Sequence, residues 1–182
     1  QKISEITLFD IIEAPYPNNT NIPIQSKSGD ISDIDVSKNL ILSKPDIIFH
    51  LAAIVSGQAE QEFDLGWDIN AKGSWGLFEA IRHQGENYCP RLVFTSSIAV
   101  FGAPFPDKIP DDFFTTPLTS YGAQKAISEL LLADYSRKKM IDGVSIRLPT
   151  ICVRPGKPNL AASGFFSGII REPLNGQEAI LP

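Results

Sequence analysis

The sequence predicts an α/β fold: a parallel β-sheet that is doubly wound, with helices on both of its faces. Short apolar runs alternate along the chain with longer segments in which apolar residues recur every three or four positions. Strands and helices in this alternation form right-handed crossovers, which make the strands parallel. With 182 residues, of which 43% are hydrophobic and 20% charged, the chain can bury a substantial core.

Five segments are expected to be strands. They are short and apolar, and turn residues separate them from the segments that follow. The segment 46–53 is almost continuously apolar, as a strand that is covered on both faces requires. The expected strands are residues 6–10, 22–26 (the weakest), 46–53, 91–96 and 143–148.

Two strong helices are expected, at residues 67–81 and 120–139, and a shorter one around 165–171. A loop rich in proline and aspartate precedes the second of them. The first helix is predicted by apolar residues at steps of four or three positions, which place them on one helix face. These residues are Trp67, Ala71, Trp75, Phe78 and Ile81.

Composition excludes several classes of partner. Sixteen Lys and Arg residues stand against 21 Asp and Glu, and no basic run is present, so we expect no nucleic-acid partner. No stretch reaches the roughly 18 apolar residues of a membrane span, so no membrane partner is expected. Cys89 and Cys152 are far apart and too few for a metal site or a disulfide scaffold, which indicates no bound metal and a cytoplasmic location.

Four polar residues form the strongest candidate for chemistry. Ser96 and Ser97 end an expected strand, where parallel sheets bind their ligands, and Tyr121 and Lys125 open an expected helix. The spacing of Tyr121 and Lys125 places both side chains on one helix face. An ammonium group near a phenol lowers the pKa of the phenol, so the sequence predicts that Tyr121 acts as a general base.

These residues lie in motifs that run along nearly the whole chain, and together they resemble the extended short-chain dehydrogenase/reductase family, also called the NAD-dependent epimerase/dehydratase family. The resemblance implies a Rossmann-like fold and NAD as the cofactor. The matching segments are Leu8-Phe9-Asp10, Gly29-Asp30-Ile31, DIIFHLAA at 46–53, Asn70-Ala71-Lys72-Gly73, FTSSIAVFG at 94–102 and SYGAQK at 120–125.

The resemblance implies a catalytic role for three of the four polar residues. Tyr121 corresponds to the proton acceptor, and Lys125 to the residue that holds the nicotinamide ribose and tunes the phenol. Ser97 corresponds to the serine that orients the substrate, and its neighbour Ser96 is the competing candidate for this role.

The resemblance also implies a cofactor site. Asp10 corresponds to the acid that binds the adenosine ribose hydroxyls; a carboxylate there repels a 2′-phosphate, which favours NAD over NADP. The alternative is an ordinary turn or helix-capping aspartate. His50, inside an apolar strand, is interpreted as a hydrogen-bonded structural residue. The other expected cofactor-binding residues are Asp30, Ile31, Leu51, Ala52, Ala53, Asn70, Tyr121, Lys125 and Pro149.

Three segments, 50–57, 99–106 and 147–159, are similar to the part of this family that oxidises the four-carbon sugar acid D-erythronate. The expected reaction is NAD-dependent oxidation of a secondary alcohol, giving 2-dehydro-D-erythronate. Arg154 is the preferred fork for the substrate carboxylate, with a solvent-exposed loop charge as the alternative. Ser56, Ser97 and Tyr121 are expected to contact the substrate hydroxyls.

Two other functions stay open at this point. One is a nucleotide-sugar epimerase or dehydratase, which uses the same catalytic residues with a larger pocket. The other is a non-catalytic dinucleotide-binding protein, although such a protein has no need for Ser97, Tyr121 and Lys125 together. A homodimer is expected, formed through the helix of Tyr121 and the helix at 67–81.

The position of Asp10 predicts an incomplete nucleotide-binding unit. A glycine-rich turn precedes the ribose-binding acid by about 20 residues in such units. Only nine residues precede Asp10, and none of the 13 glycines forms the required run after a strand. We therefore expect residues 1–148 to be a partial NAD-binding domain without its first strand and Gly-rich loop. Residues 149–182, with five prolines, are expected to begin a substrate-binding region.

Overall fold

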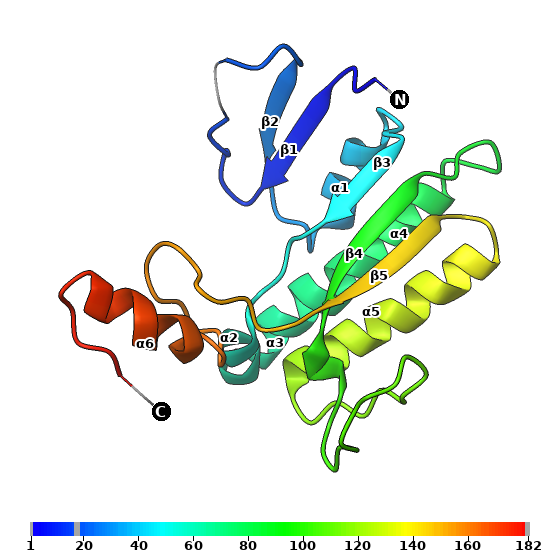
Figure 1. The fold of residues 1–182 in the computed structure, drawn as a ribbon. Helices are drawn as coiled ribbons and strands as arrows, with labels where there is room; N and C mark the ends of the chain where they lie inside the picture. Colours follow the sequence, from blue (N-terminus) through cyan, green and yellow to red (C-terminus); the bar gives the residue numbers. More distant parts are fainter. Residues whose placement is uncertain (1, 17–18, 181–182) are drawn as a thin grey trace.

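The computed structural model describes residues 2–16 and 19–180. It contains five strands, six α-helices, one π-helical segment and one 3₁₀ turn (Figure 1). In chain order these are β1 (Ile6–Asp10), β2 (Ile24–Ser28), α1 (Ile34–Ile41), β3 (Ile47–His50), α2 (Ser56–Gln61), α3 (Phe63–Gly66), the π-helical η1 (Trp67–Gly73), α4 (Ser74–Arg82), β4 (Arg91–Ser97), the 3₁₀ turn η2 (Ile98–Val100), α5 (Ser120–Arg137), β5 (Asp142–Leu148) and α6 (Phe165–Leu174).

All strand pairs are parallel, which confirms the predicted α/β class. The strands form two separate sheets among the described residues, β1-β2 and β3-β4-β5. Figure 1 shows them in the spatial order β2, β1, β3, β4, β5. In the order 3-2-1-4-5-6 of a doubly wound sheet, the break between β1 and β3 falls at the place of the first strand. The topology therefore agrees with the expectation that this chain lacks that strand.

Helices cover one face of the three-stranded sheet. The core between this face and the helices includes Phe78 and Ile81 of α4, Leu92 and Phe94 of β4, and Leu132 of α5. All of these side chains are almost completely buried. Since α1 packs on α4, which in turn contacts α5, the helices form one continuous layer behind the sheet.

The opposite face of this sheet is exposed in the described part of the chain. Ile47 and Phe49 of β3 and Val144 and Ile146 of β5 all point away from the helical layer and are exposed, Phe49 by 66%. The sequence predicted burial of the 46–53 strand on both faces. Only one face has a helical cover here, and the strand itself ends at His50, so residues 51–55 form a loop.

The predicted helix at 67–81 is divided into η1 and α4. The cause is the backbone carbonyl of Asn70, which accepts hydrogen bonds from Ser74 Oγ at 2.6 Å and from Ser128 Oγ at 3.2 Å. Hydroxyl groups that bond to a helical carbonyl compete with the regular backbone pattern and widen or bend the helix. Periodicity alone did not reveal this change, because the apolar spacing continues through it.

Helix α5 begins where the sequence predicted. Thr119 caps it, and the Thr119 hydroxyl accepts a hydrogen bond from the Gly122 amide at 3.1 Å. Helix α1, which the sequence analysis did not predict, has a similar cap in Asp33, whose side chain accepts from the Asp35 amide at 2.9 Å. With eight residues, α1 offers too short a periodic pattern for detection.

Truncation of Phe78 tests the assignment of the core. Phe78 is fully buried, so the Phe78→Ala substitution removes apolar burial and leaves a cavity, and we expect the free energy of unfolding to fall by about 3 to 5 kcal/mol. Urea denaturation followed by circular dichroism measures this change. Leu42→Ala at the end of α1, where Leu42 is 67% exposed, is the matched control and is expected to cost less than about 1 kcal/mol. Equal costs for the two variants would contradict the assignment.

Candidate active site

The polar residues singled out from the sequence converge at the carboxyl ends of the strands. Ser97 ends β4, and Tyr121 lies in the first turn of α5. The approach of α5 to the η2 turn depends on Gly122, because a Cβ atom there would lie only 2.2 Å from the Ala99 carbonyl oxygen. A residue without a side chain therefore lets the phenol of Tyr121 reach the serine at the end of β4.

Lys125 is buried and contacts strand β4 of the sheet. Its Nζ donates a hydrogen bond to the Thr95 carbonyl at 2.8 Å and lies 4.7 Å from the centre of the Phe94 ring. The same Nζ is 5.7 Å from the centre of the Tyr121 ring. Burial lowers the pKa of Lys125 from 10.5 to about 8, so its charge is retained at neutral pH.

The pKa of Tyr121 differs from the sequence prediction. The sequence predicted that the neighbouring ammonium group would lower it. In the structure burial raises the pKa of Tyr121 above 10, and the Ser97 hydroxyl and the Arg154 charge offset only part of this rise. The prediction was wrong in sign because it considered the charge of Lys125 without the desolvation of the phenol.

The two candidate serines have different environments. Ser97 is half-buried, and its Oγ accepts a hydrogen bond from the Ala99 amide at 3.1 Å. Its hydroxyl also lowers the pKa of the Tyr121 phenol through a hydrogen bond. Ser96 points into the interior, where it is 3% exposed and its Oγ has no hydrogen-bond partner among the described residues. This geometry favours Ser97 over Ser96 as the serine that meets a substrate.

Asn70 connects the loop after β3 to α5. Its side chain is 1% exposed and pairs with both backbone groups of Ile54: Oδ1 accepts from the amide at 2.8 Å, and Nδ2 donates to the carbonyl at 3.2 Å. Asn70 Nδ2 also donates to Gln124 Oε1 at 2.8 Å. In this structure Asn70 therefore fixes the backbone around the expected cofactor contacts.

His50 is a structural residue in this arrangement. Its Nε2 lies 2.9 Å from Ser74 Oγ, whose proton is donated to the Asn70 carbonyl, so Nε2 of the neutral ring carries the proton. Burial first, and the nearby Lys125 charge second, lower the pKa of His50 from 6.5 to about 3. Because the ring stays neutral over the physiological pH range, His50 donates a hydrogen bond through Nε2 but does not act as a general acid.

The expected cofactor residues lie along one edge of the two sheets. Asp10 ends β1 and is exposed, and its Oδ1 accepts from the Ile11 amide at 2.7 Å. Asp30 follows β2 and binds the amide and the hydroxyl of Ser32. The remaining candidates are Ile31, which is buried, and Leu51, Ala52, Ala53 and Pro149, which follow the ends of β3 and β5. The Asp10 carboxylate keeps its second oxygen available, so a turn role and ribose binding are compatible.

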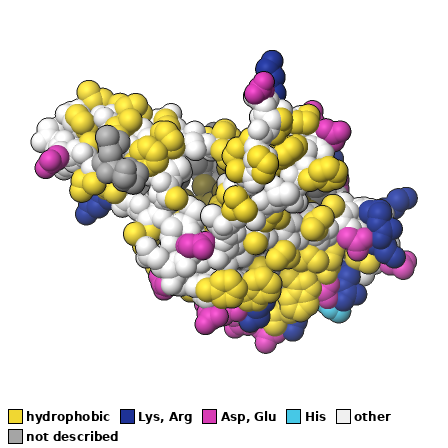
Figure 2. Space-filling view, turned by 90° about the horizontal axis from the view of Figure 1, so that it is seen from below, with side chains coloured by type: hydrophobic (Ala, Val, Ile, Leu, Met, Phe, Trp, Pro, Cys, Tyr) yellow, Lys and Arg dark blue, Asp and Glu magenta, His cyan; other side chains and the backbone are white. Residues whose placement is uncertain are grey.

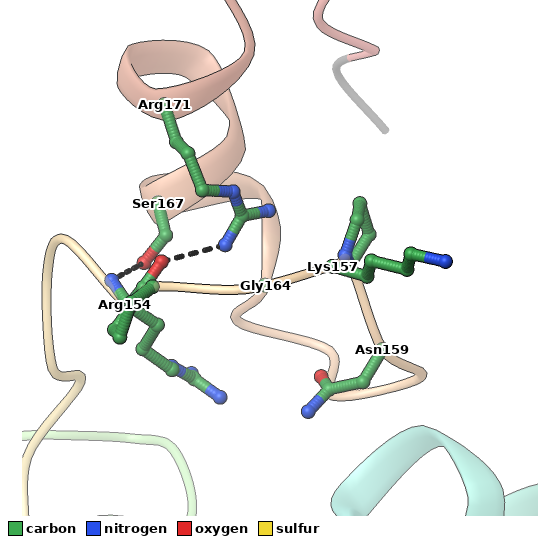
Figure 3. Close-up of a pocket in the computed structure, with 8 residues that line it drawn as sticks. Arg154, Lys157, Asn159, Gly164, Ser167 and Arg171 are labelled. Carbon is green, nitrogen blue, oxygen red and sulfur yellow. Dashed lines mark hydrogen bonds between the residues drawn. The ribbon is translucent and has the colours of Figure 1, made fainter. Parts of the chain in front are cut away.

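A small cationic pocket lies in the segment that follows β5 (Figure 3), and the charge of Arg154, one of its lining residues, lowers the pKa of Tyr121. Arg154 Nη2 donates to Ser163 Oγ at 2.8 Å, and Arg171 Nη1 donates to the Arg154 carbonyl at 2.7 Å. The other lining residues are Pro155, Lys157, Pro158, Asn159, Gly164 and Ser167. Figure 3 shows the ends of the Arg154 and Asn159 side chains extending toward each other.

Ion pairing distinguishes Arg154 from two other arginines in the last quarter of the chain, Arg147 and Arg171. Arg147 pairs with Glu129 at 2.8 Å and stacks on the Phe101 ring, and Arg171 pairs with Glu172 at 2.5 Å. Within the described residues, Arg154 has no carboxylate partner. Of the three, it is therefore the one whose charge is available to an anionic ligand.

Ser56 is already engaged by the protein. Its Oγ accepts a hydrogen bond from the Ala162 amide at 3.0 Å, which leaves the hydroxyl proton and one lone pair for a ligand. Sequence reasoning also missed Gln124 and Glu60: Gln124 is buried beside Lys125, and Glu60 Oε2 accepts from the Ser120 amide at 2.9 Å at the start of α5. The position of Gln124 inside the Tyr121–Lys125 motif was the one available signal.

The described residues contain no group of three or more His, Cys, Asp and Glu side chains placed to hold a metal ion. Within the same part of the chain, no helix is long and apolar enough to cross a membrane.

Residues 6–182 match the model of the NAD dependent epimerase/dehydratase family. The chain belongs to this family. Its family relatives include the curated D-erythronate dehydrogenases of Cupriavidus necator, 49% identical over 99% of the chain, and of Haemophilus influenzae, 44% identical over 99%. The chain spans 54% and 56% of their lengths, about half of each.

A crystal structure from the same family is also similar to this chain. It is described as a nucleoside-diphosphate-sugar epimerase from Agrobacterium tumefaciens, and it is 58% identical, with a TM-score of 0.91. The match covers 98% of this chain and 53% of that one. The fold of the described residues is thus that of the epimerase/dehydratase family.

The buried ammonium group of Lys125 predicts a pH dependence of stability. Its pKa is about 8 in the folded protein and 10.5 in the unfolded one, so the unfolded state binds more protons between these values. Stability should therefore rise with pH in this window, by on the order of 2 kcal/mol between pH 8 and pH 10. Urea denaturation of the protein and of a Lys125→Met variant at several pH values isolates the effect, and a parallel course of the two curves would contradict it.

Proposed function

We propose that the protein oxidises the C2 hydroxyl of D-erythronate to 2-dehydro-D-erythronate, with NAD as the hydride acceptor. The observation that carries the proposal is the convergence of Ser97, Tyr121 and Arg154, which has no carboxylate partner among the described residues, in a chain 44% to 49% identical to two curated D-erythronate dehydrogenases. A proton acceptor and an anion-binding group side by side suit a hydroxy acid.

The donors and acceptors of the site fit the two ends of a dinucleotide. The exposed Asp10 carboxylate at the end of β1 can accept hydrogen bonds from the adenosine ribose hydroxyls, with Asp30 and Ile31 beside it. Lys125 and Tyr121 are proposed to bind the nicotinamide ribose. The part of the cofactor site between the two riboses is proposed to be lined by Leu51, Ala52, Ala53 and Pro149 and positioned by Asn70. When bound, NAD accepts the hydride that leaves C2.

Tyr121 is proposed to take the proton of the C2 hydroxyl. The phenolate accepts this proton while the C2–H bond breaks, and the electron pair of the O–H bond forms the new carbonyl. The Ser97 hydroxyl and the Arg154 charge already favour the phenolate in the free protein, and they oppose the effect of burial. Lys125 contributes a positive charge on the side of the ring that faces the sheet.

Ser97 and Arg154 are proposed to orient the substrate. The Ser97 hydroxyl donates to the oxygen at C2, which becomes the carbonyl oxygen. The guanidinium of Arg154 binds the carboxylate at C1, where a charge-assisted hydrogen bond holds the acid more strongly than a neutral donor does. Ser56 retains one proton, which can reach a hydroxyl further along the chain of the substrate.

The Agrobacterium structure supports a second candidate, a nucleotide-sugar epimerase, since it is described as such at 58% identity. The same Ser97 and Tyr121 would then remove and return a proton, with no net formation of NADH. Incubation of the purified full-length protein with NAD and D-erythronate distinguishes the two, because only the dehydrogenase produces a lasting absorbance of NADH.

We infer that the active form is a homodimer in the cytoplasm. Trp67 and Trp75 stand eight positions apart along η1 and α4 and are 39% and 41% exposed, and Leu130 on α5 is exposed as well. Large apolar side chains on adjoining helices suit a protein interface. Figure 2 shows how extensively apolar side chains gather on one face of the molecule.

Cys89 and Cys152 are free and exposed, which suits a reducing compartment.

Removal of the Tyr121 hydroxyl tests the general base. Tyr121→Phe keeps the ring and deletes the proton acceptor, so we expect kcat for D-erythronate to fall about 10²- to 10⁴-fold. Affinity for NAD, measured by calorimetry on the same variant, should fall by no more than about tenfold, because Tyr121 is only one of several proposed contacts to the cofactor. Tyr16→Phe, at an exposed tyrosine far along the sequence from the site, is the control. Full activity of Tyr121→Phe would refute the assignment and leave a binding role for the protein.

Arg154→Ala tests the carboxylate contact. The loss of one charge-assisted hydrogen bond should raise KM for D-erythronate roughly 10- to 100-fold. Because Arg154 also favours the Tyr121 phenolate, the pH at which the rate becomes half-maximal should move upward. Initial rates between pH 6 and pH 10 measure both effects. Lys157→Ala, in the same pocket, gives a reference for a non-forked charge, and an unchanged KM in Arg154→Ala would exclude the proposed contact.

A further inference from the structure

Helix α2 comes very close to the segment that lines the cationic pocket at a glycine, Gly57. A Cβ atom on Gly57 would lie 2.1 Å from the Leu160 carbonyl oxygen and 3.3 Å from the Leu160 carbonyl carbon. Both of these are backbone atoms, which cannot turn aside as a side chain does. Any residue other than glycine at position 57 must therefore displace residues 155–164 from α2.

The helix itself gives no reason for this glycine. Gly57 is the second residue of α2, and its backbone is not in the left-handed region that favours glycine. Alanine would stabilise an ordinary helix by about 1 kcal/mol relative to glycine. The close approach to Leu160 is thus the one feature of the structure that requires the absence of a side chain here.

A second contact fastens the same segment at the neighbouring residue. The Ala162 amide donates to Ser56 Oγ at 3.0 Å. One residue further, the hydroxyl of Ser163 accepts from Arg154 Nη2 at 2.8 Å. The segment therefore connects the start of α2 directly to the guanidinium that carries the unpaired charge.

Arg154 is positioned from several sides. Its Nε donates to the Ile151 carbonyl at 3.3 Å, its amide donates to Ser167 Oγ at 3.0 Å, and its own carbonyl accepts from Arg171 at 2.7 Å. Ser163 is the contact that fixes the far end of its side chain, and Ser163 belongs to the segment that Gly57 admits. Asn159, which faces Arg154 across the pocket, belongs to it too (Figure 3).

We propose that Gly57 is a specificity-determining position: by admitting the 155–164 segment against α2, it holds Arg154 and Asn159 in place for the carboxylate of the substrate. This inference rests on the proposed oxidation of a sugar acid. Gly57 touches neither the reacting atoms nor the carboxylate, so it is a positioning residue. Its effect should appear mainly in the binding of the acid, and the proton transfer at Tyr121, which the Arg154 charge also influences, should change much less.

Gly57→Ala in the full-length protein is the test. We expect KM for D-erythronate to rise about tenfold or more, because a displacement on the order of 1 Å is enough to disturb a binding fork. The value of kcat and the KM for NAD should stay within about twofold of the parent, since Tyr121, Lys125 and the cofactor edge are unaffected. In the absence of substrate, hydrogen exchange of the Ala162 amide should become faster, because its bond to Ser56 Oγ is broken.

Gly76→Ala is the matched control. It makes the same substitution inside a helix, but a Cβ there would meet only Ile34 Cγ1 at 3.8 Å, an ordinary contact distance. KM and the exchange of the Ala162 amide should both match the parent. Ser56→Ala leaves the space at position 57 free and removes the acceptor of the Ala162 amide, together with the hydroxyl proposed to reach the substrate, so only its hydrogen exchange is compared and not its KM. It should accelerate the exchange as well, and it serves if Gly57→Ala proves poorly folded.

The outcomes separate this inference from the proposed function. Faster exchange with an unchanged KM in Gly57→Ala would overturn the role in specificity, and a raised KM with unchanged exchange would overturn the contact as its cause. A parent protein that forms no NADH from D-erythronate refutes the proposed function. In that case the exchange of Ala162 still reports whether Gly57 holds the segment.

Discussion

The buried amide of Asn70 is the interaction on which the arrangement of the site depends. It pairs with both backbone groups of Ile54 and with the side chain of Gln124, so it joins the loop after β3 to the helix that carries Tyr121 and Lys125. The backbone carbonyl of Asn70 accepts hydrogen bonds from the hydroxyls of Ser74 and Ser128. A buried side-chain amide with three hydrogen bonds is costly to disturb, since each group left unpaired there loses its full solvation. The π-helical turn of η1 follows from the same set of bonds.

Local sequence information was sufficient for much of this site. Tyr121 and Lys125 share one face of a capped helix because they lie within about one helical turn of each other. The placement of Ser97 depends only on the short apolar strand that it ends. The alternation of strand and helix was enough for the parallel topology. The bonds of Asn70 were beyond the sequence, because Gln124 lies 54 positions away and no periodic pattern connects the two. The helical layer on a single face of the sheet was not predicted, because the almost continuous apolar run at 46–53 indicated a strand that is covered on both faces.

Desolvation explains why the electrostatic predictions were less successful. The charge of a neighbour can be seen in a sequence, whereas the amount of water removed from a side chain cannot. Tyr121 and Lys125 are affected mainly by burial, which acts against the charged form of each, so the phenol becomes a weaker acid and the ammonium a stronger one. The arginines show the complementary case. Arg147 and Arg171 have acidic partners and Arg154 has none among the described residues, a difference that the one-dimensional order of charges does not contain.

The break between the two sheets has a consequence for the handling of this polypeptide. On one side of it β1 is bonded only to β2, and on the other β3 is bonded only to β4, so each presents a row of backbone donors and acceptors without a strand partner in the described part of the chain. The exposed side chains of Ile47 and Phe49 border the second of these rows. Unpaired edges beside apolar side chains are templates for the addition of a strand from another molecule. A preparation of this segment by itself would thus favour edge-to-edge association, and the associated fraction would rise steeply with protein concentration.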